Sequence, residues 1–301
     1  MRIKTAALQG IASAAAALLC LAWPAAAQVS NVAERVLKVP VEFEDMYRKS
    51  IAREITVTVF EASGRAPYPL MVLSHGRAIN QAGRHKLGRV RYSEASKNFA
   101  ALGYSVWVPT RIGYGVSGTD EDPEDSGACG SKNYPPAYAA ATEQVLQVIA
   151  YAKQLPEIDG TRIVHVGQSF GGTTSIALAA RTPPGLLASI NFAGGGGGNP
   201  DTRPGEPCDP HRLAELFAGY GKDARVPTLW IYTENDRYFA PRHVRTWYDA
   251  FRARGGSGEL LLLPPFGEDG HLLFSRGISV WQPLVERFLL AHIPTKEMKA
   301  Q

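Results

Sequence analysis

The stretch "IVHVGQSFGGTTS", residues 163–175, changes in its middle from the pattern of a strand to that of a helix. Apolar, β-branched residues lead up to Gly167, and small residues follow Gly171. Ser169 lies between them in the pattern G-x-S-x-G. A serine on a sharp strand-to-helix turn is strained and exposed, and glycines two positions away remove side chains that would collide with the turn. The stretch predicts that Ser169 is a nucleophile; the alternative is a structural glycine-rich turn.

Strand-like and helix-like segments alternate on both sides of this turn. Expected strands cover residues 35–43, 53–62, 69–76, 104–110, 162–167, 186–194, 226–236 and 258–265. Expected helices begin near Ser93, Pro136, Phe170, Pro241 and Val280. Such alternation predicts one α/β domain with a mostly parallel central sheet and helices on both faces. The first two strands have no helix between them, so they should form an antiparallel edge.

Composition and charge point to a small-molecule partner. The 301 residues are 45% hydrophobic and 20% charged, which is ordinary for a soluble globular protein. The net charge is +4, and Arg2 and Lys4 contribute two of these charges. A balance so close to neutral does not indicate nucleic-acid binding.

The N-terminus has the pattern of a secretory signal. Arg2 and Lys4 precede the apolar run "IASAAAALLCLAW" (residues 11–23), and Ala25 to Ala27 offer a small-residue cleavage site. We therefore expect a signal peptide at residues 1–27, a single domain at residues 28–301, and export to the periplasm or beyond the cell. The alternatives are an uncleaved anchor or a buried helix. Leu19 precedes Cys20 where a lipoprotein signal needs a small residue, so no lipid anchor is expected.

Removal of the signal leaves two cysteines, Cys129 and Cys208, both in glycine- and proline-rich segments. In an oxidising compartment they are expected to form a disulfide. The alternative, a reactive thiol, has no strand-turn-helix around either cysteine to support it. The long loops near residues 110–135 and 194–212 are candidates for the walls of a site.

A nucleophilic serine needs a general base, and the base needs an acid to orient it. His271 follows the last expected strand in the loop "FGEDGHLLF" and is the predicted base. Asp236 follows the preceding strand in "TENDR" and is the predicted acid, with Glu234 as the alternative. Asp269, beside Gly270, is better suited to forming a turn. Three further histidines downstream of the serine fit surface or capping positions better: His211, His243 and His292.

Two backbone N–H groups are expected to stabilise an oxyanion. One belongs to Phe170, directly after the serine, at the start of a helix. The other is that of Arg77 in "LMVLSHGRAIN", where Gly76 permits a tight turn. His75 in the same segment is expected to be structural. A less favoured hypothesis gives the Arg77 side chain an acidic group of the substrate.

The pieces "SHG", "GQSFGG", "YTENDRYF" and "GEDGH" together resemble secreted serine hydrolases of the α/β-hydrolase superfamily, nearest the dienelactone hydrolase-like branch. The resemblance implies the α/β-hydrolase fold and hydrolysis of carboxylic esters through Ser169, His271 and Asp236, without a cofactor. The enzymes that give the branch its name use cysteine where this chain has Ser169, which argues against dienelactone as substrate. The alternatives are a serine peptidase or amidase on the same fold, and a non-catalytic binding protein.

Three other patterns carry no site. "GYGVSG" (residues 113–118) resembles a dinucleotide fingerprint, but an acidic, proline-broken segment follows it instead of a helix. "AGGGGGNP" (residues 193–200) is expected to be a flexible connection beside the site. "RHKLGRVR" (residues 84–91) is expected to be a solvated loop, with an acidic polymer or membrane surface as the alternative partner. Neither H-E-x-x-H nor a paired-cysteine metal pattern occurs, so no metal is expected.

Overall fold

Eight strands pair into one sheet in the computed structural model, which describes residues 32–293. The signal peptide expected at residues 1–27 lies outside the described residues. The strands are β1 (Glu34–Glu44), β2 (Ser50–Phe60), β3 (Tyr68–Ser74), β4 (Ser105–Thr110), β5 (Ile158–Gln168), β6 (Leu186–Phe192), β7 (Thr228–Thr233) and β8 (Gly258–Leu263). Their order across the sheet is β1-β2-β4-β3-β5-β6-β7-β8.

The direction of the strands follows the sequence prediction. The pairs β1–β2 and β2–β4 are antiparallel, and every other neighbouring pair is parallel. Every residue of β4 and β7 is buried, as expected for strands covered on both faces. Edge strand β1 instead alternates buried and accessible residues along its second half. The mostly parallel sheet with an antiparallel N-terminal edge is therefore confirmed.

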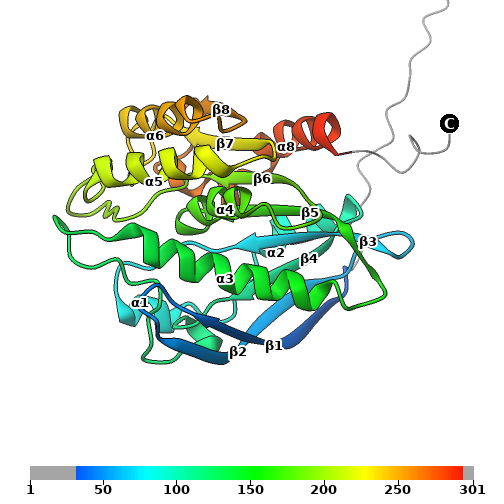
Figure 1. Ribbon diagram of the computed structural model, residues 1–301. Coiled ribbons are helices and arrows are strands. Elements are labelled where there is room, and N and C mark those ends of the chain that lie inside the picture. The colour runs from blue at the N-terminus through cyan, green and yellow to red at the C-terminus, as the bar shows by residue number, and fades with distance from the viewer. Residues whose placement is uncertain (1–31, 294–301) are drawn as a thin grey trace, which may run out of the picture. The chain divides into compact units, whose positions relative to one another are not determined.

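Helices cover both faces of the sheet (Figure 1). They are α1 (Gln81–Lys86), α2 (Ser93–Ala101), α3 (Tyr134–Ala152), α4 (Phe170–Arg181), α5 (Pro210–Asp223), α6 (Pro241–Ala253), α7 (Leu273–Arg276) and α8 (Ile278–His292), with single 3₁₀ turns η1 (Gly115–Ser117) and η2 (Gly270–Leu272). One core packs α2, α7 and α8 on the sheet through residues such as Phe99, Phe274 and Trp281. The other face carries α3 to α6, in two further clusters.

Five of these helices begin where the sequence predicts them, and α1, α5 and α7 do not appear in that prediction. Helix α5 follows directly on the second long loop, and its apolar face buries Leu213 and Phe217. The rest of the α5 surface is mostly polar or small, and two prolines and a cysteine precede the helix. The prolines and the cysteine favour a loop, and they hide the helical periodicity of the apolar residues where α5 begins.

The basic stretch at residues 84–91 is only in part the solvated loop that the sequence predicts: four of its residues are exposed, namely His85, Lys86, Leu87 and Arg91. Its first residues belong to α1, and Arg84 is only 7% exposed because it pairs with Asp122 at 3.1 Å. Arg89 and Arg91 both pair with Glu34 on β1. The partner carboxylates come from distant segments, so the local sequence gives no sign of them.

The glycine run is packed, and the prediction of a flexible connection is wrong. Gly194, Gly195 and Gly196 are buried. Their carbonyls accept hydrogen bonds from the hydroxyls of Tyr232 (2.7 Å), Tyr138 (2.8 Å) and Tyr134 (3.2 Å), respectively. A Cβ atom on Gly195 would lie 2.6 Å from the Phe239 ring. Glycine is therefore needed here for close packing of the chain against aromatic rings.

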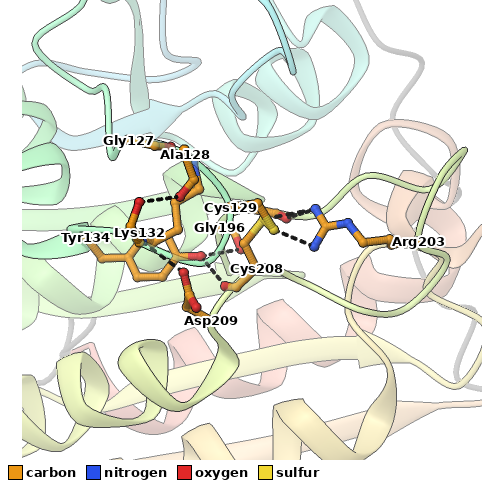
Figure 2. Close-up of a disulfide and its surroundings, with 11 residues drawn as sticks. Gly127, Ala128, Cys129, Lys132, Tyr134, Gly196, Arg203, Cys208 and Asp209 are labelled. Atoms are coloured by element: carbon orange, nitrogen blue, oxygen red, sulfur yellow. Dashed lines mark hydrogen bonds between the residues drawn. A yellow bond between two sulfur atoms is a disulfide. The ribbon is translucent and has the colours of Figure 1, made fainter.

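A disulfide joins Cys129 to Cys208 across 79 residues of sequence (Figure 2). The Arg203 guanidinium donates to both sulfur atoms, at 2.8 and 2.9 Å. The Tyr134 hydroxyl, whose single proton is shared with the Gly196 carbonyl, makes its shorter contact with the carbonyl of Cys208, at 2.5 Å. The bond thus fastens the loop before α3 to the loop before α5, and it fits the exported location that the sequence predicts.

Replacing both cysteines with serine should destabilise the fold. By the chain-entropy argument, a covalent loop of this length contributes about 4 kcal/mol to the free energy of unfolding, less any strain in the folded state. Urea unfolding of the Cys129→Ser/Cys208→Ser variant under oxidising conditions measures the loss. Wild-type protein held in reductant is the matched control and should unfold with the variant. An unchanged urea midpoint in both would contradict a stabilising role.

His165 is a buried titratable group within the sheet. It lies on β5, and its Nε2 is 2.8 Å from the hydroxyl of Ser74 on β3. Burial, aided by the charge of Arg111, lowers the pKa of His165 to about 3. The folded protein therefore holds this imidazole neutral at pH values where the unfolded chain protonates it.

The free energy of unfolding should consequently fall as the pH drops from about 6.5 towards about 3, because only the unfolded state binds the proton in that window. The slope from one such group approaches about 1.4 kcal/mol per pH unit. His165→Gln keeps a polar group near Ser74 but cannot titrate. Urea unfolding at a series of pH values should give a shallower decline for this variant than for wild type, and equal slopes would contradict the prediction.

Candidate active site

Ser169 occupies the turn between β5 and α4 with backbone angles of φ 58° and ψ −122°. A positive φ is strained for a residue with a side chain, and such strain is typical of functional turns. The flanking glycines make the turn possible: a Cβ on Gly167 would overlap the carbonyl of Gly171, and a Cβ on Gly171 would overlap the carbonyl of Ser74. Gly172 is also constrained, because a Cβ there would overlap Oδ1 of Asn191; the G-x-S-x-G pattern does not include this glycine.

His271 and Asp236 meet at the carboxyl end of the sheet. His271 lies in η2 after β8, and Asp236 lies in the turn after β7. The His271 Nδ1 atom is 3.0 Å from Oδ2 and 3.2 Å from Oδ1 of Asp236. Each residue is only 5% exposed. The Tyr238 ring stacks on the imidazole at 4.0 Å between centroids, so the ring of His271 is held on one side by an aromatic face.

The carboxylate and the histidine loop are each held by backbone groups. Oδ1 of Asp236 accepts from the N–H groups of Tyr238 (2.7 Å) and Phe239 (3.0 Å). Asp269 accepts from the His271 N–H at 3.0 Å, which is the turn-forming role expected of it. Glu234, the alternative acid, is exposed.

The other three histidines downstream of Ser169 lie away from the pair of Asp236 and His271. His211 and His292 are exposed, and His243 lies 2.9 Å from Glu206. Gln168, next to Ser169, donates from its side chain to the His271 carbonyl at 3.3 Å and so ties the two loops together. Within residues 32–293, no hydrogen bond joins the Ser169 hydroxyl itself to His271. Catalytic hydrogen bonds are often long in the absence of substrate.

The segment Ser74–Arg77 passes directly beside the serine. A Cβ on Gly76 would lie 3.0 Å from Cβ and 3.5 Å from Oγ of Ser169. Phe170 opens α4, where a backbone N–H has no partner one turn earlier in the helix. Among the described residues, neither the Phe170 N–H nor the Arg77 N–H donates a hydrogen bond. Both groups are therefore available to an oxygen atom at the serine.

The two side chains of this segment have structural partners. His75 is buried, and its Nδ1 lies 2.7 Å from the Gly76 carbonyl. The Arg77 guanidinium makes a forked contact with Asp122 at 2.7 and 2.5 Å. Burial opposes the charge of Arg77, but Asp122 raises the pKa of the guanidinium above its ordinary value. Asp122 thus pairs with the charge of Arg77 within the protein. This pairing argues against the hypothesis that the Arg77 side chain holds an acidic substrate group.

A cavity of about 310 Å³ opens at Ser169. Its volume is at the small end of the range for ligand sites. Both long loops line it, as the sequence predicts: Ser126, Cys129, Lys132 and Tyr134 come from one, and residues 195–199, Arg203 and Cys208 from the other. The other lining residues, besides Ser169 itself, are Arg77, Ala78, Ile79, Phe170, Tyr238 and Phe239. Burial lowers the pKa of Lys132.

Residues 32–293 contain no group of three or more histidine, cysteine or acidic side chains placed to share a metal ion. None of their helices combines the length and apolar character that crossing a membrane requires.

The protein was compared with known structures. A protein from Klebsiella pneumoniae subsp. pneumoniae assigned as a dienelactone hydrolase matches with a TM-score of 0.57 and 16% identity, over 85% of this chain and 98% of that one. Acetyl xylan esterase 1 from Thermoanaerobacterium sp. matches with a TM-score of 0.56 and 14% identity, over 86% and 88%. An acylaminoacyl peptidase from Pyrococcus horikoshii matches with a TM-score of 0.53 and 15% identity, over 84% of this chain but 41% of that one.

At these identities the likeness is one of fold, the α/β-hydrolase fold. A search of curated proteins gave no match. A family comparison is more specific: residues 87–265, more than half of the chain, match the dienelactone hydrolase family. This span includes the serine turn and Asp236, while His271 follows it. On this match, the chain belongs to the dienelactone hydrolase family.

Proposed function

We propose that the protein is a serine hydrolase of carboxylic esters, with Ser169 as nucleophile, His271 as general base and Asp236 as the acid that orients it. The observation that carries the proposal is the buried contact between Asp236 and His271 beside a strained serine that lines a cavity. This is the set of roles that acyl transfer by a serine requires. Membership of a hydrolase family supports it.

The proposed cycle begins with the neutral imidazole. Because Nδ1 faces the Asp236 carboxylate, the proton resides there, and Nε2 is left to accept the proton of the Ser169 hydroxyl. Oγ then attacks the ester carbonyl carbon, and the new oxyanion accepts hydrogen bonds from the N–H groups of Phe170 and Arg77. Collapse of the tetrahedral intermediate releases the alcohol, which leaves with the proton that His271 took from Ser169. Water, activated by the same imidazole, then hydrolyses the acyl-enzyme.

The size of the cavity favours a small substrate over a long peptide chain. A volume of about 310 Å³ behind two loops fixed by a disulfide suits a small ester. The peptidase that shares the fold is a much longer chain, of which the matched region is 41%. A panel of short and long acyl esters beside aminoacyl amides tests the choice, and faster turnover of the amides would favour a peptidase. A non-catalytic binding protein is disfavoured because all three proposed positions keep their reactive side chains.

Ser169→Ala should abolish ester hydrolysis and labelling by a fluorophosphonate, because the variant lacks the attacking oxygen. The exposed Ser63 lies in the loop between β2 and β3, so Ser63→Ala is the matched control and should keep both. The measurements are turnover of a short-chain ester and the mass of the labelled protein. Wild-type turnover in Ser169→Ala would show that another group is the nucleophile.

Asp236→Asn should lower kcat by about 10⁴-fold, because an amide no longer selects the imidazole tautomer with a free Nε2. Glu234→Gln, an equivalent change in the exposed residue two positions earlier, should leave kcat unchanged. Steady-state kinetics of the pair, with thermal unfolding to verify folding, distinguish the two acids. If Glu234→Gln lowered kcat and Asp236→Asn did not, Glu234 would be the acid that orients His271.

A further inference from the structure

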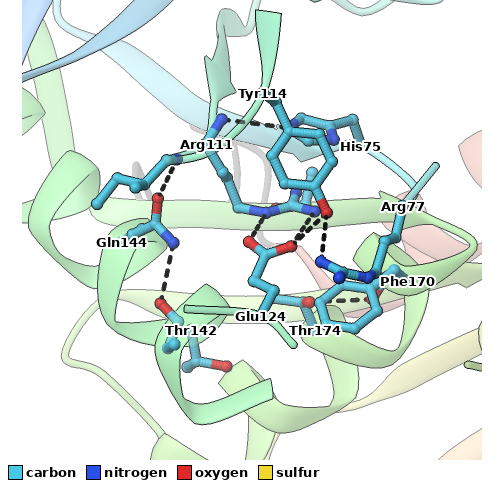
Figure 3. Close-up of polar contacts among 12 residues, drawn as sticks. His75, Arg77, Arg111, Tyr114, Glu124, Thr142, Gln144, Phe170 and Thr174 are labelled. Carbon is cyan, nitrogen blue, oxygen red and sulfur yellow. Dashed lines mark hydrogen bonds and ion pairs between the residues drawn. The ribbon is translucent and has the colours of Figure 1, made fainter. Parts of the chain in front are cut away.

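A wholly buried ion pair lies close to the proposed oxyanion site (Figure 3). Arg111 follows β4, and Glu124 lies in the loop before α3; both side chains are 0% exposed. Nε of Arg111 is 2.5 Å from Oε1 of Glu124, and Nη2 is 3.2 Å from Oε2. Burying two charges carries a large desolvation penalty, and apolar replacements of such pairs are often equally stable. What the pair contacts is therefore more informative than its own stability.

The first contact runs through main-chain groups. The Arg111 N–H donates to Nε2 of His75 at 3.2 Å. Burial, together with the charge of Arg111, lowers the pKa of His75 well below its ordinary value, so the ring is neutral and Nε2 can accept. The ring proton then lies on Nδ1, which donates to the Gly76 carbonyl at 2.7 Å.

This hydrogen bond determines the direction of the next N–H group. Gly76 C=O and Arg77 N–H belong to one peptide unit, and in a trans peptide these groups point in opposite directions. The only cis peptide among the described residues is Ala66–Pro67. By holding the Gly76 carbonyl, His75 therefore aims the Arg77 N–H away from its own ring.

The second contact runs through side chains. The Tyr114 hydroxyl donates to Oε2 of Glu124 at 2.8 Å and accepts from Nη1 of Arg77 at 3.2 Å. The Tyr114 ring also packs edge-on against the His75 ring, with 4.6 Å between centroids. Arg77 is thus held at its side chain by the same pair that holds its peptide group through His75.

The pair also borders the other proposed donor. The Arg111 guanidinium lies 5.7 Å from the centroid of the Phe170 ring and 5.4 Å from that of Tyr114. Its Nη1 has no hydrogen-bond partner among the described residues, so part of the charge faces these aromatic rings instead. The network therefore adjoins both residues whose N–H groups are the proposed oxyanion donors.

We propose that Arg111 and Glu124, acting through His75 and Tyr114, are positioning residues that fix the Gly76–Arg77 peptide in the geometry needed to bind the oxyanion. The inference rests on the proposed function. It explains why a charged pair is retained where no solvent or substrate reaches it: preorganised donors stabilise a transition state only if their direction is fixed beforehand.

Three substitutions test the network. Tyr114→Phe removes only the oxygen that joins Glu124 to Arg77, and should lower kcat about tenfold, as expected for one hydrogen bond. His75→Ala removes the donor to the Gly76 carbonyl and should lower kcat by about 10²-fold, close to the loss of one oxyanion donor. His75→Asn places an amide nitrogen near the position of Nδ1 and should recover most of that loss. KM should stay close to the wild-type value in all three.

A trifluoromethyl ketone provides a measurement that a purely structural role would not affect. It forms a tetrahedral adduct with a serine, so its affinity should fall in parallel with kcat/KM across the series. Tyr248→Phe is the control, because it removes a hydroxyl that donates to the Gly258 carbonyl at the amino end of β8, and it should change neither quantity.

The outcomes separate this inference from the proposed function. If wild-type protein forms no adduct with the ketone, or Ser169→Ala still forms one, the proposed function is wrong. If wild type forms the adduct but His75→Ala and Tyr114→Phe bind the ketone and turn over ester as wild type does, the positioning network is wrong. Reduced thermal stability with unchanged ketone affinity and kcat would also overturn it, because the network would then be only structural.

Discussion

The site depends on one steric constraint, the direct backbone contact between the serine turn and the end of β3. Gly171 lies so close to the carbonyls of Ser74 and His75 that no side chain fits between them. This contact brings the segment that follows β3 against Ser169, with Gly76 beside its Cβ and Oγ. The proposed donor groups, the proposed nucleophile Ser169 and the first turn of α4 are therefore all positioned by this contact.

The parallel sheet supplies the other half of the arrangement. Because β3, β5, β7 and β8 all run in one direction, the loops after them meet at a single edge. Ser169 follows β5, Asp236 follows β7 and His271 follows β8. Loops that carry residues about a third of the chain apart thereby end at the same edge, and Ser169 and the two long loops line the cavity there.

Much of this architecture could be predicted from the sequence, because its signals are local. The eight strands, the strand-turn-helix at Ser169, and the order serine, aspartate, histidine are all visible in short segments. What escaped prediction depends on partners far away in the chain. Arg84 is buried because Asp122 reaches it, and the glycine run is packed because three tyrosine hydroxyls bind its carbonyls. The pairing of Arg111 with Glu124 likewise requires the fold of the loop before α3.

The disulfide also divides the site topologically. The chain from Cys129 to Cys208 is a closed covalent ring, and it contains α3, β5, Ser169, α4 and the glycine run. Asp236 and His271 lie outside this ring, on the segment that follows it. Ser169 and the two long loops that line its cavity therefore belong to one tethered unit, whereas the proposed acid and base, and the lining residues Tyr238 and Phe239, join it only by folding. Any opening that separates β7 and β8 from β6 would move the His271 imidazole away from Ser169 and remove Tyr238 and Phe239 from the cavity wall, while the two long loops stay joined by the disulfide.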